Sequence, residues 1–171
     1  MKVLTRTLLI LSLFVGLTSV AIATTDTAQS TVTITFSEIS ELAVSGNPAT
    51  LTIVAPATAG DLPADQSDAT TTMAWTSNVD AGQTRKITGS LATLFDGIDL
   101  YATITATSGT GTSAGEVKFT IAATAYDFVT AIGNCNTSNE TITFRANVTS
   151  MVAPYTSTAK VVTWTLTEDA V

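Results

Sequence analysis

The sequence contains no histidine, and it has only seven lysines and arginines against fourteen aspartates and glutamates. Without histidine, the chain lacks His-based acid–base catalysis, Ser-His-Asp and Cys-His nucleophiles, and His-ligated zinc or copper. The shortage of positive charge argues against nucleic acid and anionic membranes as partners. These absences exclude several large classes of enzyme and nucleic-acid-binding protein, and they favour a protein that is not an enzyme.

Cysteine and long hydrophobic runs are also scarce. Cys135 is the only cysteine, so no internal disulfide can form, and the thiol is either buried and inert or free to pair with another molecule. One apolar stretch, Leu8–Val20, follows Lys2 and Arg6 and precedes the A-x-A-like site Ala21-Ile22-Ala23. This order is typical of a signal peptide cleaved after residue 23. We therefore expect a secreted or cell-surface protein whose mature form does not enter a membrane.

The mature chain has the size of one domain. Removing residues 1–23 from 171 leaves 148 residues, and it leaves five basic residues against fourteen acidic ones, a net charge of −9. That length is enough to bury a core without disulfides. We expect a flexible lead-in over residues 24–30 and a single domain over residues 31–171.

Alternation of apolar and polar residues is the strongest pattern in the chain. In Lys160–Thr167, one side carries Val162, Trp164 and Leu166 and the other carries mainly threonine. Threonine makes up about one residue in five of the whole chain, well above average usage. Period-two alternation of β-branched and aromatic residues is typical of half-buried strands. Thr31–Phe36 has the same pattern and is the first predicted strand.

Between these two segments the pattern repeats, with turn signals every eight to twelve residues and no amphipathic helix. We expect Met73 and Trp75 to face the core, Ile121 to face inward, and the strand near residue 40 to carry a bulge. The segment 126–132 is either a strand or a helical turn. Further strands are predicted at 38–45, 51–54, 70–77, 85–91, 98–107, 116–122 and 140–148. The sequence therefore predicts an all-β fold, an Ig-like or jelly-roll-type antiparallel β-sandwich of about eight or nine strands.

Acidic residues suggest a calcium site. Asp61, Asp65 and Asp68 lie on one predicted loop, and calcium takes six to eight oxygen ligands without needing histidine. The spacing fits no EF-hand, so the alternative is a solvated acidic loop. A second group, Asp80 with Asp96 and Asp99, lies near predicted strand ends. Calcium is thus a candidate ligand, and no other cofactor is expected.

Two further features bear on function. Asn136, Asn139 and Asn147 each begin an N-glycosylation sequon. Glycosidases use a pair of carboxylates for catalysis, and Glu38 and Glu41 are one such pair close in sequence. A glycosidase also needs a cleft and aromatic platforms. Trp75 and Trp164, the two tryptophans, alternate with other core-facing residues, so a hydrolase is the weakest of the functional hypotheses.

Two resemblances add to this interpretation. The C-terminal segment Val162–Ala170, with its Trp-Thr-Leu, resembles the closing segment of WxL-domain surface proteins, which implies cell-wall or carbohydrate binding. For that function, Trp75 or Trp164 would have to lie exposed beside a tyrosine such as Tyr101, Tyr126 or Tyr155. Over the whole mature chain, the Thr/Ala/Gly-rich β composition is similar to the secreted subunits of prokaryotic extracellular fibres, of the TasA-like and archaeal bundling-pilus type. That resemblance implies assembly by insertion of an N-terminal strand into the next subunit.

The N-terminal segment also suggests assembly on physical grounds. Thr31–Phe36 follows a short polar tail, and Val32, Ile34 and Phe36 share one face. A strand added to an exposed sheet edge gains backbone hydrogen bonds, and its alternate side chains fill pockets. The alternative is that this strand pairs within its own domain. We therefore expect a non-enzymatic filament or surface-layer subunit, whose partners are copies of itself or other cell-surface components.

Overall fold

A computed structural model describes residues 29–154 and 159–169. The predicted signal peptide, residues 1–23, and Tyr155 lie outside the described residues. The chain divides into two units, Met1–Thr35 and Phe36–Val171, and all the strands belong to the second. None of the described residues forms a helix long and apolar enough to cross a membrane.

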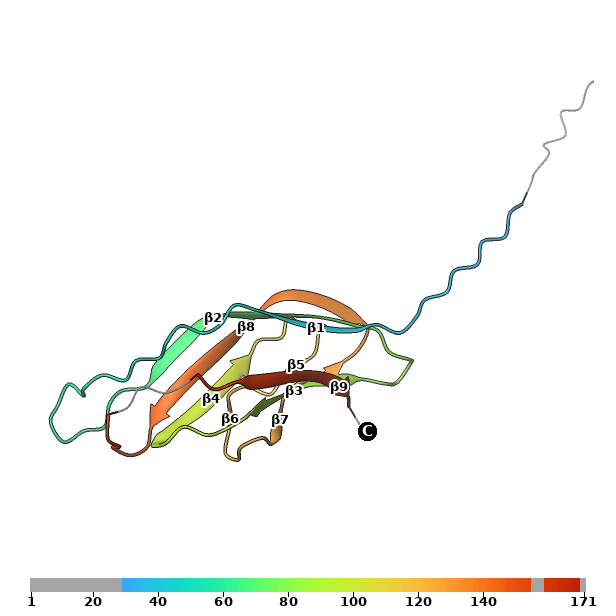
Figure 1. The fold of residues 1–171 in the computed structure, drawn as a ribbon. Helices are drawn as coiled ribbons and strands as arrows, with labels where there is room; N and C mark the ends of the chain where they lie inside the picture. Colours follow the sequence, from blue (N-terminus) through green and yellow to red (C-terminus); the bar gives the residue numbers. More distant parts are fainter. Residues whose placement is uncertain (1–28, 155–158, 170–171) are drawn as a thin grey trace, which may run out of the picture. The chain divides into compact units, whose positions relative to one another are not determined.

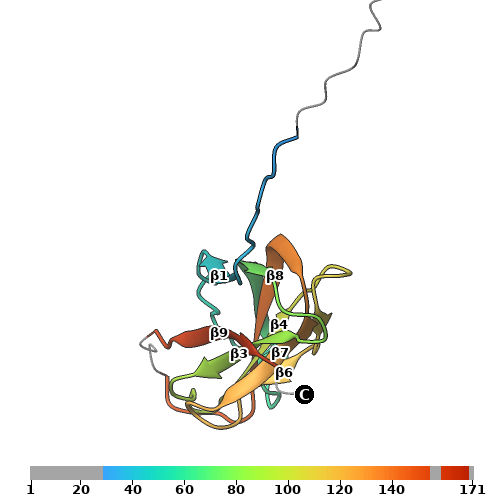
Figure 2. The ribbon, with the colours of Figure 1, turned by 90° about the vertical axis from the view of Figure 1, so that its right-hand side faces the viewer.

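The second unit is a two-layer antiparallel β-sandwich, which confirms the predicted fold class (Figures 1 and 2). The described residues form nine strands and no helix. One sheet has the order β1-β2-β8-β4-β6 and the other the order β5-β7-β3-β9. The strands are β1 (Ser40–Ser45), β2 (Gln66–Ser77), β3 (Arg85–Leu91), β4 (Ile98–Ile104), β5 (Thr112–Ser113), β6 (Val117–Lys118), β7 (Ala125–Ile132), β8 (Cys135–Val148) and β9 (Val162–Glu168).

The core lies between the two sheets and follows the period-two pattern of the sequence. Met73 and Trp75 on β2 are buried, as predicted. Ile142 and Phe144 on β8 face the same interior, opposite Phe128 on β7. Because successive side chains of a strand point to opposite faces, each strand contributes alternate residues to this layer. Thirteen buried residues form one continuous core cluster in the described part of the chain, so the sandwich has a single hydrophobic core.

Two predicted strands are wrong. Residues 31–39 and Leu51–Val54 have no strand assignment, although both segments alternate as strands do. Pro48 and Pro56 flank the second segment, and proline has no N–H to donate to a sheet. Leu51 and Ile53 are nevertheless half-buried while Thr52 is exposed, so the alternation places side chains correctly without sheet hydrogen bonds.

Other segments refine the sequence prediction. Residues 126–132 are a strand, β7, and β1 pairs with β2 in an unbroken register, so the predicted bulge near residue 40 is wrong. The predicted strand at 116–122 shrinks to the two residues of β6, and Ile121 is 61% exposed instead of facing inward. The backbone N–H groups of Thr120 and Ile121 donate to the Tyr126 hydroxyl at 3.2 and 2.9 Å. These bonds turn the chain out of the sheet after Phe119.

Gly89 on β3 is closely covered by aromatic rings from the two strands beside it in the same sheet, Phe128 on β7 and Trp164 on β9. A Cβ atom there would lie less than 3 Å from ring atoms of Trp164 and Phe128, whose rings pack edge to face at 4.9 Å. Gly89 pairs with Trp164 across the β3–β9 ladder. Glycine is therefore required because the indole occupies the volume that a side chain would take.

We predict that Gly89→Ala lowers the free energy of unfolding by about 1–3 kcal/mol, the usual cost of overpacking a core. Urea denaturation followed by tryptophan fluorescence measures the effect. Ser90→Ala, on the opposite face of the same strand, is the control and should change stability by less than about 0.5 kcal/mol. Equal stability of Gly89→Ala and the wild type would contradict this packing.

Candidate assembly site

The apolar N-terminal segment lies exposed in the described chain. Val32, Ile34 and Phe36 are 76%, 82% and 77% exposed. The residues around them, from Gln29 to Ile39, have no strand assignment. The alternative, that Thr31–Phe36 pairs within its own domain, is therefore not seen among the described residues. The segment keeps the alternating pattern of a strand but pairs with none of the described strands.

The chain enters the sandwich at a fixed point. The Asn78 side-chain amide donates to the Ser37 carbonyl at 2.9 Å and accepts from the Ile39 N–H. The guanidinium of Arg85, which is 4% exposed, donates to the Ile39 carbonyl at 2.7 Å and forms an ion pair with Glu38. Without these contacts, the buried guanidinium of Arg85 would lack hydrogen-bond partners, which is costly. These contacts hold residues 37–39 at one end of the sheets.

The two ends of the sandwich differ in character. We call the end where β1 begins and β2 ends the anchor end, since Ser37–Ile39 is held there by Asn78. A polar hollow of about 250 Å³ lies at this end, lined by residues such as Asp80 and Gln83. We call the opposite end, where β2 and β4 begin and β8 ends, the groove end.

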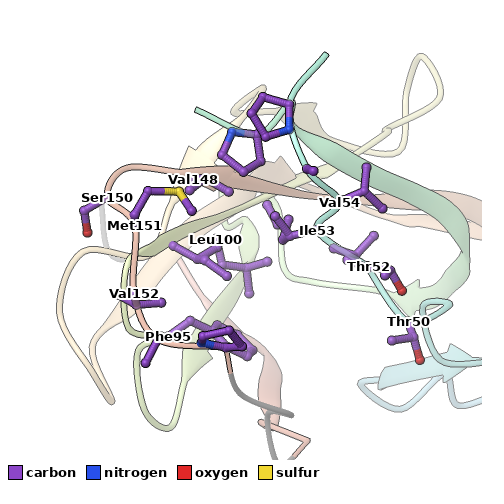
Figure 3. A pocket seen from close by; sticks show the side chains of 18 residues that line it. Thr50, Thr52, Ile53, Val54, Phe95, Leu100, Val148, Ser150, Met151 and Val152 are labelled. Atoms are coloured by element: carbon purple, nitrogen blue, oxygen red, sulfur yellow. The ribbon is translucent and has the colours of Figure 1, made fainter. Parts of the chain in front are cut away.

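An apolar cavity of about 630 Å³ opens at the groove end (Figure 3). The extended segment Thr50–Pro56 forms one wall, and Ser150–Pro154 forms another. Between them lie inward-facing residues of the first sheet, including Leu100 on β4 and Val148 on β8. None of the lining residues is charged. We call this cavity the groove; the two sheets leave it uncovered between these walls.

The predicted calcium ligands do not form one site. Asp65 accepts hydrogen bonds from Asn147 at 2.7 Å and from Arg145, and these contacts lower the pKa of its carboxyl. Asp68 lies on β2 and accepts from Thr70 at 2.7 Å, which lowers its pKa. Asp61 lies exposed on the loop before them. The described residues contain no group of three acidic or cysteine side chains able to hold a metal, so calcium stays a prediction.

The second acidic group has other contacts. Asp99 forms an ion pair with Lys118 at 2.5 Å. Asp80 lies at the anchor end, whereas Asp96 and Asp99 lie near the start of β4 at the groove end. The three carboxylates are therefore not gathered around one point.

The three sequons differ in accessibility. Asn136 and Asn139 are exposed on β8, and Asn139 has a positive φ of 61°. Asn147 is half-buried, and its amide nitrogen is the donor to Asp65. A glycan on Asn147 would have to fit at a half-buried position beside Asp65, so the exposed Asn136 and Asn139 are the better acceptors.

The tryptophans are parts of the core. Trp75 is 1% exposed, and its indole N–H donates to the Thr110 carbonyl at 3.1 Å. Trp164 is half-buried against Phe128 and Phe144. Neither ring forms an exposed platform with Tyr101 or Tyr126 on which a sugar would stack.

Cys135 is half-buried at the start of β8, and its Sγ lies 3.7 Å from the Thr110 carbonyl. Burial raises the pKa of this thiol. A raised pKa reduces the fraction of reactive thiolate, so the position does not suit a nucleophile.

Among the described residues one carboxylate is buried, that of Glu140 on β8, which is 4% exposed. It accepts hydrogen bonds from the Thr137 hydroxyl at 2.7 Å, the Thr105 hydroxyl at 2.9 Å and the Thr107 N–H at 3.1 Å. Burial alone would raise the pKa of this carboxyl, but the hydrogen bonds outweigh burial and lower it. A general acid needs a raised pKa, so Glu140 is structural: it ties β8 to the segment that follows β4.

We predict that Glu140→Gln lowers the free energy of unfolding at pH 7 by about 1–3 kcal/mol, because hydrogen bonds to a charged acceptor are lost. The folded-state pKa is below the unfolded one. The stabilisation is therefore complete above the unfolded pKa, near 4.3, and is lost as pH falls through the folded pKa.

Urea denaturation from pH 7 down to pH 3 checks this dependence, with exposed Glu41→Gln as the matched control. The gap between wild type and Glu140→Gln should narrow in acid. A gap that is constant across this range would show that ionisation of Glu140 does not stabilise the fold.

Comparison with models of known protein families, with curated proteins and with solved structures finds no match for this chain.

Sequence reasoning identified the exposed segment and missed the groove. The signal for the groove was present in the connections. Met151–Pro154 is apolar, and three of the four residues of Leu51–Val54 are apolar, where a connecting loop is usually polar. Apolar residues in a connection indicate a surface that packs against something. The sequence did not reveal that these two connections lie together on opposite sides of one cavity.

Proposed function

We propose that the mature chain is an exported, non-enzymatic structural subunit of an extracellular filament or surface layer, which assembles by N-terminal strand exchange. The observation that carries this proposal is the exposure of Val32, Ile34 and Phe36 in a segment without a strand partner. Three large apolar side chains exposed at alternate positions form an apolar surface, and such a surface indicates burial against another molecule.

The sheets offer free edges for such an exchange. β1 and β9 end their respective sheets on the same side of the sandwich and contact each other. On β9, the inward-facing Val162, Trp164 and Leu166 are only half-buried. An edge strand exposes unpaired N–H and C=O groups that an added strand satisfies. A chain with both a free strand and free edges joins copies head to tail, and such contacts generate filaments.

The binding-module hypothesis has less support. It requires an exposed tryptophan beside other aromatic residues, whereas Trp75 is buried and Trp164 packs on Phe128 and Phe144. The structural hypothesis does not depend on either ring being exposed.

Negative-stain electron microscopy of residues 24–171 tests the proposal. We predict filaments from this chain and none from a variant with Val32, Ile34 and Phe36 all changed to Asp, because three charges cannot enter an apolar site. The matched control changes Thr31, Thr33 and Thr35 to Asp. It adds the same charge to the opposite face of the segment and should still form filaments.

Each sample is prepared with calcium and with a chelator. If filaments form only with calcium, assembly depends on calcium binding by acidic residues such as Asp61. A folded monomer from residues 24–171 under every condition would contradict the proposal, as would filaments from the variant with three apolar residues changed to Asp.

A further inference from the structure

We infer that the groove is the acceptor for residues Thr31–Phe36 of a second copy of this chain, and that Leu51–Val54 is the backbone partner of the inserted strand. This inference rests on the proposed function and deepens it, since it assigns the site that receives the exchanged strand.

Exposed apolar side chains are concentrated at the groove end. Ten large apolar side chains are exposed in the described part of the chain. Three belong to the N-terminal segment and one, Val44, to β1. Of the other six, Val54 and Met151 line the groove. The remaining four lie on connections at the same end of the sandwich: Leu62, Leu94, Ile121 and Val161. Exposed apolar side chains gathered at one end of a domain are typical of an interaction site.

The N-terminal segment and the groove are both free of charged residues. No charged residue occurs from Gln29 to Ser37, and none lines the groove. Insertion would therefore remove no charge from water, which is the largest cost of binding at an apolar site. The cavity volume of about 630 Å³ falls within the range of about 300–1,000 Å³ of pockets that bury drug-sized ligands.

The backbone of the groove wall is suited to pair with an inserted strand. Leu51–Val54 runs extended with Leu51 and Ile53 directed inward, as Figure 3 shows for Ile53. No backbone hydrogen bond links these four residues to another described residue. The wall therefore has the conformation and the free N–H and C=O groups of an edge strand, and an inserted strand would pair with them.

Residues Thr31–Phe36 are too short to extend from the anchor end to the groove of their own copy. Asn78 holds Ser37 next to the β2–β8 pair Ser77 and Cys135. Ala146, on the groove lining, lies eleven residues further along β8, about 36 Å at 3.3 Å per residue. Thr31 is only six residues before Ser37, a span of about 20 Å. The occupant must therefore come from another copy.

This arrangement joins unlike surfaces. The donor leaves the anchor end of one copy, and the acceptor lies at the groove end of the next. Such a contact is heterologous and leaves one free donor and one free groove at the two ends of every oligomer. The inference therefore predicts open chains and not closed dimers.

Disulfide mapping tests the assignment in chains that carry Cys135→Ser. An isotopically labelled chain with Ile34→Cys is mixed with an unlabelled chain that has Ile53→Cys on the groove wall. Oxidation should give the mixed disulfide between residues 34 and 53, identified by mass spectrometry. The control partner has Gln83→Cys at the anchor end. Residue 83 is exposed, so random collisions would favour its disulfide over the one with half-buried residue 53. We nevertheless expect at least tenfold less mixed disulfide with residue 83 than with residue 53.

A second pair of variants tests the groove without cysteines. Val54 and Val44 are both exposed, at 58% and 42%, so an aspartate at either position leaves the core intact. We expect Val54→Asp to abolish filaments and Val44→Asp to keep them. Circular dichroism verifies that both variants are folded.

The outcomes separate this inference from the proposed function. If the wild-type chain forms no filaments, both fail. A second outcome is that the wild-type chain forms filaments, Val44→Asp abolishes them and Val54→Asp does not. The acceptor is then the β1 edge, which overturns the groove assignment and leaves strand exchange intact. Mixed disulfides with residue 83 as abundant as those with residue 53 would overturn the assignment as well.

Discussion

Burial of the inner faces of the two sheets is the constraint on which the rest of this structure depends. Because Cys135 is the only cysteine, no disulfide forms within the chain, and stability must come from packing and sheet hydrogen bonds. The central strands β3 and β8 satisfy this constraint: Ile87 and Ile142 are fully buried, and the rings of Phe128 and Trp164 close over Gly89. The same constraint is not met at the groove end, where Leu100 and Val148 line an open cavity. The proposed assembly follows from this difference.

Polar interactions arrange the chain around that core. Arg85 and Asn78 fix the entry of the chain, and Glu140 is satisfied by three donors from neighbouring segments. On the outer face, Arg145 lies over the Tyr101 ring at 4.1 Å and pairs with Glu116 at 2.6 Å. These contacts use acidic residues for structure. They account for part of the acidic composition without a metal or a catalytic role.

Much of the fold could be predicted from the sequence because period-two alternation reports directly on burial. The strand Arg85–Leu91 has the predicted bounds, and Met73 and Trp75 face the core as expected. Prediction failed where alternation does not determine pairing. Thr31–Phe36 and Leu51–Val54 both alternate, yet neither is a strand, since pairing depends on which edge is free and on the prolines beside it.

The candidate site was only partly predictable. The apolar face of Val32, Ile34 and Phe36 is a local pattern and was visible in the sequence. The groove combines segments about 100 residues apart, Thr50–Pro56 and Ser150–Pro154, and no local pattern connects them. The contact of Asp65 with Arg145 spans 80 residues, which is why a loop of three aspartates suggested a calcium site. Long-range contacts of this kind depend on the register of the sheets.

The central claim is that residues 31–36 are unpaired in a single copy and become a strand on assembly. Hydrogen–deuterium exchange, measured by mass spectrometry on dispersed chains and on assembled material, tests it most directly. The account predicts fast exchange of the amides of Thr31–Phe36 in dispersed chains, and protection of these amides together with those of Leu51–Val54 in the assembly. Assembled material in which residues 31–36 still exchange as fast as in dispersed chains would contradict it.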